Sequence, residues 1–383
     1  MTAPAPSNPA TRAPLPEFLD AATRSRLAAS AAAADRSGRP DLDAVALLRR
    51  TGLLGLAVPY AYGGAGADPV ELNHHVAEVA AVNGSAAIML FQHYAVSSRI
   101  VEQGTPAQLA ELLPKLASGE WLAASAWSET GAGADKRNLS TTGRRTEGGG
   151  WVLDGAKSFT TSAGLADVYL VLVRTGQAPD AGAAGTGYGA AGQTFFLVRG
   201  DNPGLVPDTS LPLAGMRGSA TGFVSLRDCR VADTDRLGPA GEAASIIARV
   251  RESGATLGAV ALGLARAALD CAHDHAVARG LLAHQAVRHR LVDLATEVEA
   301  ARAVVERAGR RDSADPGTTT LHSKLCATAA ADRVMTGVEQ ILSSAGYAEA
   351  HPLNRYRRDA RAVALMGPTN DLCRELVSTS WTR

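Results

Sequence analysis

Two stretches of the chain decide its fold. They read Ala126-Trp127-Ser128-Glu129-Thr130-Gly131-Ala132-Gly133-Ala134-Asp135 and Trp151-Val152-Leu153-Asp154-Gly155-Ala156-Lys157-Ser158-Phe159-Thr160-Thr161-Ser162-Ala163. The first leaves an apolar run and turns through glycines and small residues, which let the backbone lie close to a ligand. In the second, Asp-Gly lies between β-formers, which predicts a hairpin of two strands. Each stretch also places a hydroxyl beside an aromatic side chain, a pattern that suits a flat heteroaromatic ligand with polar edges: Trp127 with Ser128, and Phe159 with Thr161.

Length and composition set the class of protein. The chain has 383 residues, 46% of them hydrophobic, which is enough for large shared cores. Its 38 basic residues balance its 38 acidic residues, so charge gives no argument for a nucleic-acid partner. The four cysteines lie far apart without metal spacing, which predicts reduced thiols in a cytoplasmic protein and no metal site. No apolar run is long enough for a signal peptide or a membrane span, and residues 1–15 are expected to be a disordered leader.

The texture of the chain divides it into three domains. Residues 16–120 show apolar residues at three- and four-residue spacing, which predicts an all-helical N-terminal domain. Residues 121–232 change to short β-branched runs separated by glycine-rich loops, which predicts a middle β-domain of sandwich or barrel type. It has no strand-helix-strand alternation and no G-x-G-x-x-G, so a Rossmann fold is excluded. Residues 233–383 are helical again and long enough for a four-helix bundle, with single helices expected over 246–278, 285–310 and 321–342.

Several ordered blocks resemble the acyl-CoA dehydrogenase family of flavoproteins. Residues 128–135 are similar to the family's T-E-P-G-A-G-S-D, and residues 155–162 to its G-x-K-x-[FW]-I-T-N. Further blocks resemble V-P-E-E-Y-G-G-x-G, G-x-R-G-S, D-C-R-V-P, Q-I-L and Y-R-D-A-R, and they lie at residues 58–66, 215–219, 228–231, 340–342 and 356–361. Because the blocks keep their order over nearly the whole chain, the resemblance covers all three predicted domains. It implies a mainly α fold with a central β-domain.

The resemblance implies a cofactor and a set of contacts for it. The cofactor is FAD, with FMN or a supplied reduced flavin as alternatives. Trp127 and Ser128 would contact the pyrimidine edge of the flavin, Phe159 would cover a ring face, and Thr161 would bond near N5. The remaining contacts implied by matching position lie in the C-terminal domain: Arg279, Gln340, Ser344 and Thr369. This chain departs from the family around them, because Gln285 follows Arg279 about five residues early and Ser343-Ser344 replaces a Gly-Gly pair.

The catalytic base of the family is missing from its commonest position. The C-terminal Y-E-G-T-N corresponds here to a stretch in which Gly367 stands in place of the glutamate. Other members place the glutamate on the first long helix of the C-terminal domain, and there the matching position falls on Ser253. The neighbouring Glu252 is the candidate base, but one residue is about 100° around a helix, so it would face the site only if the helix begins irregularly. Otherwise Glu252 is a solvated first-turn acid favoured by the helix dipole.

The substrate side is less specific. Phe91, His93 and Tyr94 are candidates for the wall of an acyl cleft, and the alternative is that this stripe is ordinary core. His93 could donate to a carbonyl or act as a base. The resemblance implies an acyl thioester carried by coenzyme A or by an acyl-carrier protein.

Three functions follow from these observations. The first is a flavin-dependent oxidoreductase that dehydrogenates an acyl thioester with a non-standard base and passes electrons to an acceptor. The second is a monooxygenase of the same fold that receives reduced flavin from a reductase and hydroxylates nitrogen, sulfur or carbon, which would explain the missing glutamate. The third is a redox-neutral enzyme or an inactive family member. In each case the resemblance implies a homodimer or homotetramer formed through the C-terminal domain.

Overall fold

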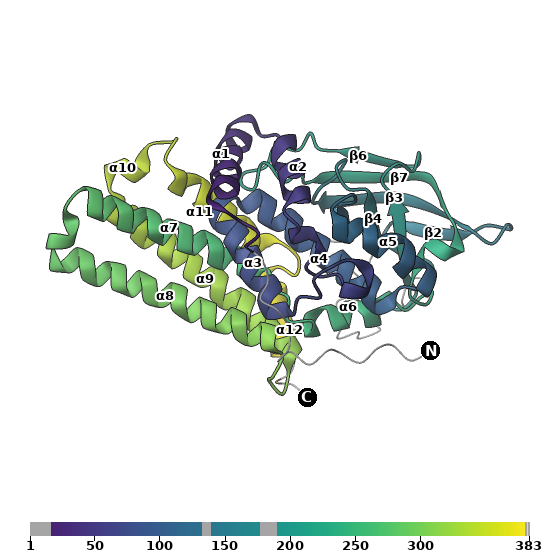
Figure 1. Ribbon diagram of the computed structural model, residues 1–383. Helices are drawn as coiled ribbons and strands as arrows, with labels where there is room; N and C mark the ends of the chain where they lie inside the picture. The colour runs from purple at the N-terminus through teal and green to yellow at the C-terminus, as the bar shows by residue number, and fades with distance from the viewer. Residues whose placement is uncertain (1–16, 132–138, 177–189, 380, 382–383) are drawn as a thin grey trace.

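The computed structural model describes residues 17–131, 139–176, 190–379 and 381. The sheet lies at one end of the molecule next to N-terminal helices, and the long C-terminal helices extend away from it toward the other end (Figure 1). This confirms the predicted class, a mainly α protein with a central β-domain. The predicted leader at residues 1–15 lies outside the described residues. Within the described part of the chain, no helix is both long and apolar enough to cross a membrane.

The N-terminal domain is helical because its boundaries carry the appropriate caps. Gly38 ends the first helix with φ +69°, and Asp68 and Glu71 form a reciprocal capping box at the third. Asn83 caps the fourth, its side chain accepting the Ala86 N–H. The helices are α1 (Ala21–Ser37), α2 (Leu42–Arg50), α3 (Pro69–Val82), α4 (Gly84–Gln103) and α5 (Pro106–Ser118), with short 3₁₀ turns η2 (Leu53–Gly55) and η3 (Tyr60–Tyr62).

The middle domain is one connected sheet. Its strands are β1 (Ala123–Ala126), β2 (Thr142–Arg145), β3 (Trp151–Thr160), β4 (Val168–Arg174), β5 (Gln193–Arg199), β6 (Leu205–Asp208), β7 (Gly222–Val231) and β8 (Arg236–Leu237). The order across the sheet is β6-β7-β3-β2-β4-β5-β8, and β1 pairs in parallel with β4. A buried cluster of Val, Leu, Phe and Ala side chains fills each face, which is why β4 and β5 read as nearly continuous apolar runs.

The hairpin predicted at Asp154-Gly155 is wrong. β3 runs without interruption from Trp151 to Thr160 and pairs along its length with β7. Asp-Gly instead makes an irregularity, where the register shifts between Leu153 and Gly155. Gly155 has φ +144°, and a Cβ there would lie 2.6 Å from the Thr141 Cα. The glycine therefore serves a bulge and a close backbone approach, which have the same local signature as a turn.

The C-terminal domain is built on three long helices that run side by side (Figure 1). They are α7 (Gly258–Ala278), α8 (Gln285–Arg310) and α9 (Pro316–Leu342), and α3 of the N-terminal domain packs on α7 and α8. The shorter elements are α6 (Ala243–Glu252), α10 (Ser344–Tyr347), α11 (Pro352–Leu365), α12 (Asn370–Ser378), η4 (Asp233–Asp235) and η5 (Leu281–Ala283). The single helix expected over 246–278 is wrong, because it is broken between α6 and α7.

A buried carboxylate joins the C-terminal helices to the sheet domain. Asp359 of α11 is 2% exposed and accepts the Met216 N–H. Burial raises the pKa of Asp359 to about 6, against its usual 3.8. The preceding Arg358 pairs with Asp35 of α1 at 2.6 Å and donates to the Ala214 carbonyl at 3.0 Å. The Y-R-D-A-R block therefore holds all three domains together.

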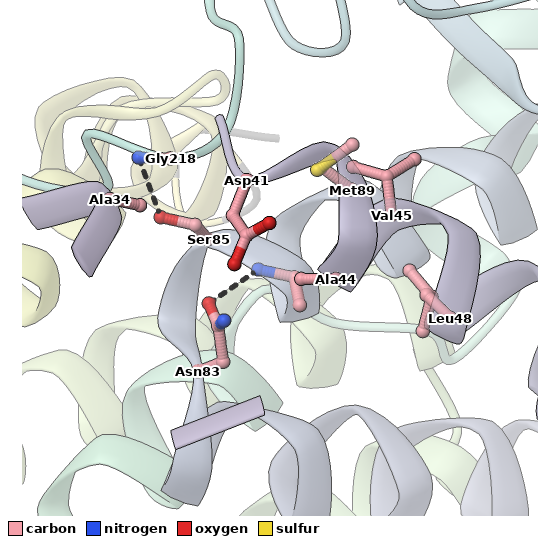
Figure 2. Close-up of a pocket in the computed structure, with 10 residues that line it drawn as sticks. Ala34, Asp41, Ala44, Val45, Leu48, Asn83, Ser85, Met89 and Gly218 are labelled. Carbon is pink, nitrogen blue, oxygen red and sulfur yellow. Dashed lines mark hydrogen bonds between the residues drawn. The ribbon is translucent and has the colours of Figure 1, made fainter. Parts of the chain in front are cut away.

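The packing near this junction leaves only a small gap. Figure 2 shows a cavity between α1, α2, the start of α4 and Gly218. It has room for about one water molecule. Ser85 Oγ accepts the Gly218 N–H at 3.1 Å, and the Asn83 side chain is bonded to the backbone of Leu27 and Ala86. The polar side chains around the cavity are thus committed to the fold.

Candidate functional site

The two stretches that opened the sequence lie against each other. The Ser158 N–H donates to the Ser128 carbonyl at 2.8 Å, so the end of β1 is tied to the middle of β3. The Trp127 indole packs on Phe195 of β5, with ring centroids 4.9 Å apart. Its Nε1 is buried and has no hydrogen-bond partner among the described residues. Both aromatic-hydroxyl pairs of the sequence are therefore neighbours on the sheet.

A buried ion pair holds these two stretches together, and the sequence reasoning gave it no role. Lys157 Nζ lies 2.7 Å from Glu129 Oε1, and both side chains are almost fully buried. Glu129 also accepts from the Ser140 N–H and hydroxyl at 2.6 Å and from the Thr141 N–H at 3.2 Å. Burial opposes the charge of Glu129, but the Lys157 ammonium and these hydrogen bonds outweigh it and lower the pKa to about 2. The signal available in the sequence for this pair was an acidic residue in the first motif and a lysine in the second.

The backbone around Phe159 and Thr161 is strained. Phe159 has φ +52° and a side chain 63% exposed, although a bulky aromatic rarely adopts a left-handed conformation or stays in water. Ser162 has φ +62° and, across from it, Met216 and Ala220 have φ +51° and +48°. Strain of this kind persists only where surrounding contacts fix it, and it gathers at functional sites. Phe159 is held out from the sheet with its face available.

A chain of hydroxyl groups runs beside that strained turn. Thr221 Oγ1 donates to Thr161 Oγ1 at 3.2 Å and lies 2.8 Å from Ser219 Oγ. Thr221 also lines a groove of about 820 Å³ between the α1–α2 connection and the loop from β6 to β7. A groove of this size matches small-molecule sites. The predicted cofactor residue Thr161 is therefore part of a hydrogen-bonded set that reaches a concave surface.

The segment where α6 gives way to α7, residues 253–257, is firmly held; we call it the α6–α7 junction. Gly254 has φ +77°, which ends α6. The buried Asn73 of α3 donates to the Gly254 carbonyl at 2.9 Å and accepts the Thr256 N–H at 3.0 Å. Ser323 of α9 donates to Thr256 Oγ1 at 2.9 Å. This is the helix irregularity on which the prediction for Glu252 depended.

Glu252 itself lies in an unexpected place. It is the last residue of α6 and is exposed, with its Cγ facing Gly317 in the first turn of α9. The alternative of a first-turn acid favoured by the helix dipole is wrong, because a carboxylate in a last turn meets the negative end of the helix dipole. Its role as base stays a prediction.

The segment that carries Gly367, residues 366–369, is the other place where the family's base can lie; we call it the Gly367 loop. Lys324 of α9 is buried and donates to the carbonyls of Met366, at 2.7 Å, and of Pro368. The predicted cofactor residue Thr369 caps α12 by accepting the Leu372 N–H at 3.2 Å. Adjacent residues of α9, Ser323 and Lys324, thus hold the two segments in which a base is expected.

Two of the three predicted substrate residues are fully enclosed. His93 accepts the Ala123 N–H at Nδ1 (3.1 Å), so its Nε2–H donates to the Leu54 carbonyl (3.1 Å), and burial lowers its pKa to about 4. The Tyr94 hydroxyl donates to the Leu53 carbonyl at 2.8 Å. Both have the contacts of core residues, which is the alternative that the sequence left open. Phe91 is only partly buried at the edge of the core.

The remaining predicted cofactor residues lie at the opposite end of the molecule. Arg279 follows α7, Gln340 is in the last turn of α9 and Ser344 begins α10, and all three are exposed. In Figure 1 these helix ends are at the far end of the bundle from the sheet. One protomer therefore does not bring them together with Thr161. Among the described residues, no group of His, Cys, Asp and Glu is arranged to hold a metal.

Comparison with known proteins decides the family. Models of the N-terminal, middle and C-terminal domains of acyl-CoA dehydrogenase match residues 15–120, 124–229 and 244–381. The chain belongs to the acyl-CoA dehydrogenase family. These boundaries cover all three predicted domains, and membership confirms the resemblance and the assignment as an enzyme. The family is one of flavoproteins, which confirms the prediction of a flavin cofactor at the level of the family.

Individual members of the acyl-CoA dehydrogenase family share the full length of the chain. Cyclohexane-1-carbonyl-CoA dehydrogenase of Geobacter metallireducens is 32% identical over 371 residues, 94% of this chain and 95% of that protein. L-prolyl-[peptidyl-carrier protein] dehydrogenase of Pseudomonas fluorescens is 29% identical over 344 residues, 87% and 88% of the two chains. The solved structure of butyryl-CoA dehydrogenase from Megasphaera elsdenii superimposes with a TM-score of 0.87 at 26% identity, over 97% of this chain and 100% of that one.

Proposed function

We propose that this protein is an FAD-dependent dehydrogenase that introduces an α,β double bond into an acyl thioester. In that reaction the substrate loses a proton from Cα and a hydride from Cβ. The thioester carrier is coenzyme A or a carrier protein, since relatives of comparable similarity are named for each. The observation that carries the proposal is the joined pair of stretches at Ser128 and Ser158, with Phe159 exposed and Thr161 beside it.

The residues present fit a flavin. An exposed aromatic face held by a strained backbone suits a tricyclic ring, and a chain of hydroxyls suits its polar rim. Trp127, Ser128, Phe159 and Thr161 would hold the ring, with Thr369 on the helical side. When bound, FAD supplies the two-electron acceptor for the dehydrogenation. FMN would use the same ring contacts but none beyond its ribityl phosphate.

The far half of FAD needs a second copy of the chain. Arg279, Gln340 and Ser344 lie together at the end of the bundle that is remote from the sheet. We infer a homodimer or homotetramer in which one protomer's bundle end meets its partner's flavin. The shortened segment after Arg279 predicts weaker FAD binding than the family motif would give. Four unpaired cysteines fit a reducing, cytoplasmic compartment.

The thioester carbonyl gains negative charge as the α-proton leaves, so the site needs a hydrogen-bond donor there. The Gly367 N–H makes no hydrogen bond to the described residues. The Met366 carbonyl of the same peptide unit points at Lys324, so the N–H points away from α9. We infer that this amide donates to the substrate carbonyl. Phe91 is the remaining candidate for contact with the acyl chain.

Glu252 is the carboxylate proposed as base. It is the last residue of α6 and lies next to Ser253, the position at which other members carry their glutamate. Replacement of Glu252 by Gln keeps the size and removes the proton acceptor. Turnover should fall by at least about 100-fold, since a general base contributes about that much, while FAD content stays constant. Unchanged turnover would remove Glu252 from the mechanism.

Anaerobic titration tests the reaction. The protein reconstituted with FAD should lose its flavin absorbance on addition of a suitable member of a panel of acyl-CoA and acyl-carrier thioesters. Protein that takes up neither FAD nor FMN would overturn the proposal.

The monooxygenase alternative is favoured by one observation, Gly367 in place of a carboxylate, because hydroxylation needs no α-proton acceptor. Oxygen uptake with a flavin reductase, together with no anaerobic bleaching, would select that alternative. Bleaching without oxygen would exclude it. If neither oxygen uptake nor anaerobic bleaching occurs, the remaining alternative is a redox-neutral enzyme or an inactive family member.

A further inference from the structure

We propose that Lys324 is a positioning residue. It orients the Gly367 N–H by donating hydrogen bonds to the carbonyls of the residues before and after Gly367. This rests on the proposed function. Lys324 Nζ donates to Met366 O at 2.7 Å and to Pro368 O. The two acceptors belong to the residues immediately before and after Gly367. A single cation thus binds the peptide group that carries the Gly367 N–H and, on the other side of Gly367, the peptide group that joins Pro368 to Thr369.

Holding the Gly367 loop with Lys324 costs free energy, because the charged side chain is buried. Its side chain is 3% exposed, and burial lowers its pKa to about 8. Within the described residues it forms no ion pair with a carboxylate. Even a buried ion pair, in which each charge has a partner, is weak evidence for a contribution to stability, because the cost of desolvation can exceed the Coulombic gain. Stability alone therefore gives a weak reason for a lysine here, whereas orientation of two carbonyls gives a specific one.

The rest of the loop is fixed from the same helix. Asn370 Nδ2 donates to Thr328 Oγ1 at 2.9 Å, one turn beyond Lys324 on α9. Asn370 Oδ1 is buried and has no partner among the described residues. With the loop held at both ends, the direction of the Gly367 N–H depends on the lysine. Glycine itself has no side chain to lock the backbone.

The experiment compares Lys324→Met with a matched control, Arg99→Met. Arg99 on α4 is also a buried cation, paired with Glu102 at 2.6 Å, and it makes no hydrogen bond or ion pair with the Gly367 loop among the described residues. In Lys324→Met, kcat for flavin bleaching should fall roughly 10- to 100-fold, the range for a misplaced oxyanion donor, while KM changes by less than about threefold. Arg99→Met should change stability only.

A second readout does not need turnover. A thioester with a ¹³C-labelled carbonyl and no hydrogen on Cβ should bind unreacted, and its C=O stretch should shift down in the wild-type protein. The shift should be lost in Lys324→Met and partly kept in Lys324→Gln, which can still donate to one carbonyl. Should Lys324→Met fail to fold, Lys324→Gln gives the same comparison.

The outcomes separate the two proposals. Wild-type kcat and an unchanged carbonyl shift in Lys324→Met would overturn the role of Lys324. A wild-type protein that shifts the carbonyl but bleaches with no thioester would overturn the dehydrogenase function and leave the Lys324 role standing.

Discussion

The two sides of the candidate site differ in how they are built. On the sheet side the family motifs are kept, and a buried ion pair, Glu129 with Lys157, locks the two stretches together. On the helical side, Gly367 stands at the position where the family resemblance leads one to expect a carboxylate, and the segments at 253–257 and 366–369 are held by neutral hydrogen bonds and one lone cation. The comparison teaches that the cofactor half is constrained by its own internal contacts. The half proposed to move the proton is held by hydrogen bonds from α9 and from Asn73 of α3.

The largest expected effect tests the rigidity of the sheet side. Lys157→Met leaves the Glu129 carboxylate buried and unpaired, and the free energy of unfolding should fall by about 3–5 kcal/mol. Urea denaturation at pH 7 measures it. The double variant with Glu129→Leu should recover part of the loss, because no charge is then left behind.

The control for that experiment is an exposed pair. Arg230→Met breaks the contact with Asp228, whose side chain is 63% exposed, and should change stability by less than about 1 kcal/mol. Equal losses from the buried and exposed pairs would contradict the assignment of the sheet side's rigidity to the buried Glu129–Lys157 pair.

The next effect is the pH dependence of stability that comes from Asp359, the residue that links the helical side to the sheet side. Asp359 has a folded pKa of about 6 against 3.8, so the folded state binds its proton more tightly than the unfolded chain. Its stabilising contribution is complete below pH 4 and is lost as the pH rises through 6, by about 3 kcal/mol. His93, with its pKa lowered to about 4, acts with the opposite sign over pH 4–6.5.

Asp359→Asn isolates the first contribution. The stability of the variant relative to the wild type should improve steadily between pH 4 and pH 6, as measured by urea denaturation at each pH. A difference that does not vary with pH would show that Asp359 titrates normally.

A smaller effect compares cofactor contacts on the two sides. Thr161→Val removes one hydroxyl from the chain with Thr221 and should weaken FAD binding by roughly five- to tenfold, the value of about one hydrogen bond. Fluorescence titration of FAD into the apoprotein measures it. A change below twofold would mean that Thr161 serves only the turn.

The smallest effect is expected from Thr369→Val. The Thr369 hydroxyl caps α12, so the variant should lose about 1 kcal/mol of stability with a smaller change in FAD affinity than Thr161→Val. A larger loss of affinity than in Thr161→Val would place the stronger cofactor contact on the helical side.

Local patterns predicted most of the fold. The limits of β4, β5 and α8 follow from continuous apolar runs and 3.6-residue periodicity, which act over short distances in the chain. The errors came where one local signal has two outcomes. Asp154-Gly155 is compatible with both a turn and a bulge. The pairing of β3 with β7 makes it a bulge. Gly254 could be tolerated in a helix, but Asn73, far away in sequence, takes its carbonyl and ends α6.

By itself the sequence determined the family, the fold class and the flavin cofactor, because each follows from the identity and order of residues in the motifs. Only the tertiary structure decided that Glu129 pairs with Lys157, that His93 bonds to two backbone groups, and that Ser323 and Lys324 bind the α6–α7 junction and the Gly367 loop. Such contacts join residues 28 to 67 positions apart. Their geometry depends on packing of whole domains, which no local pattern encodes.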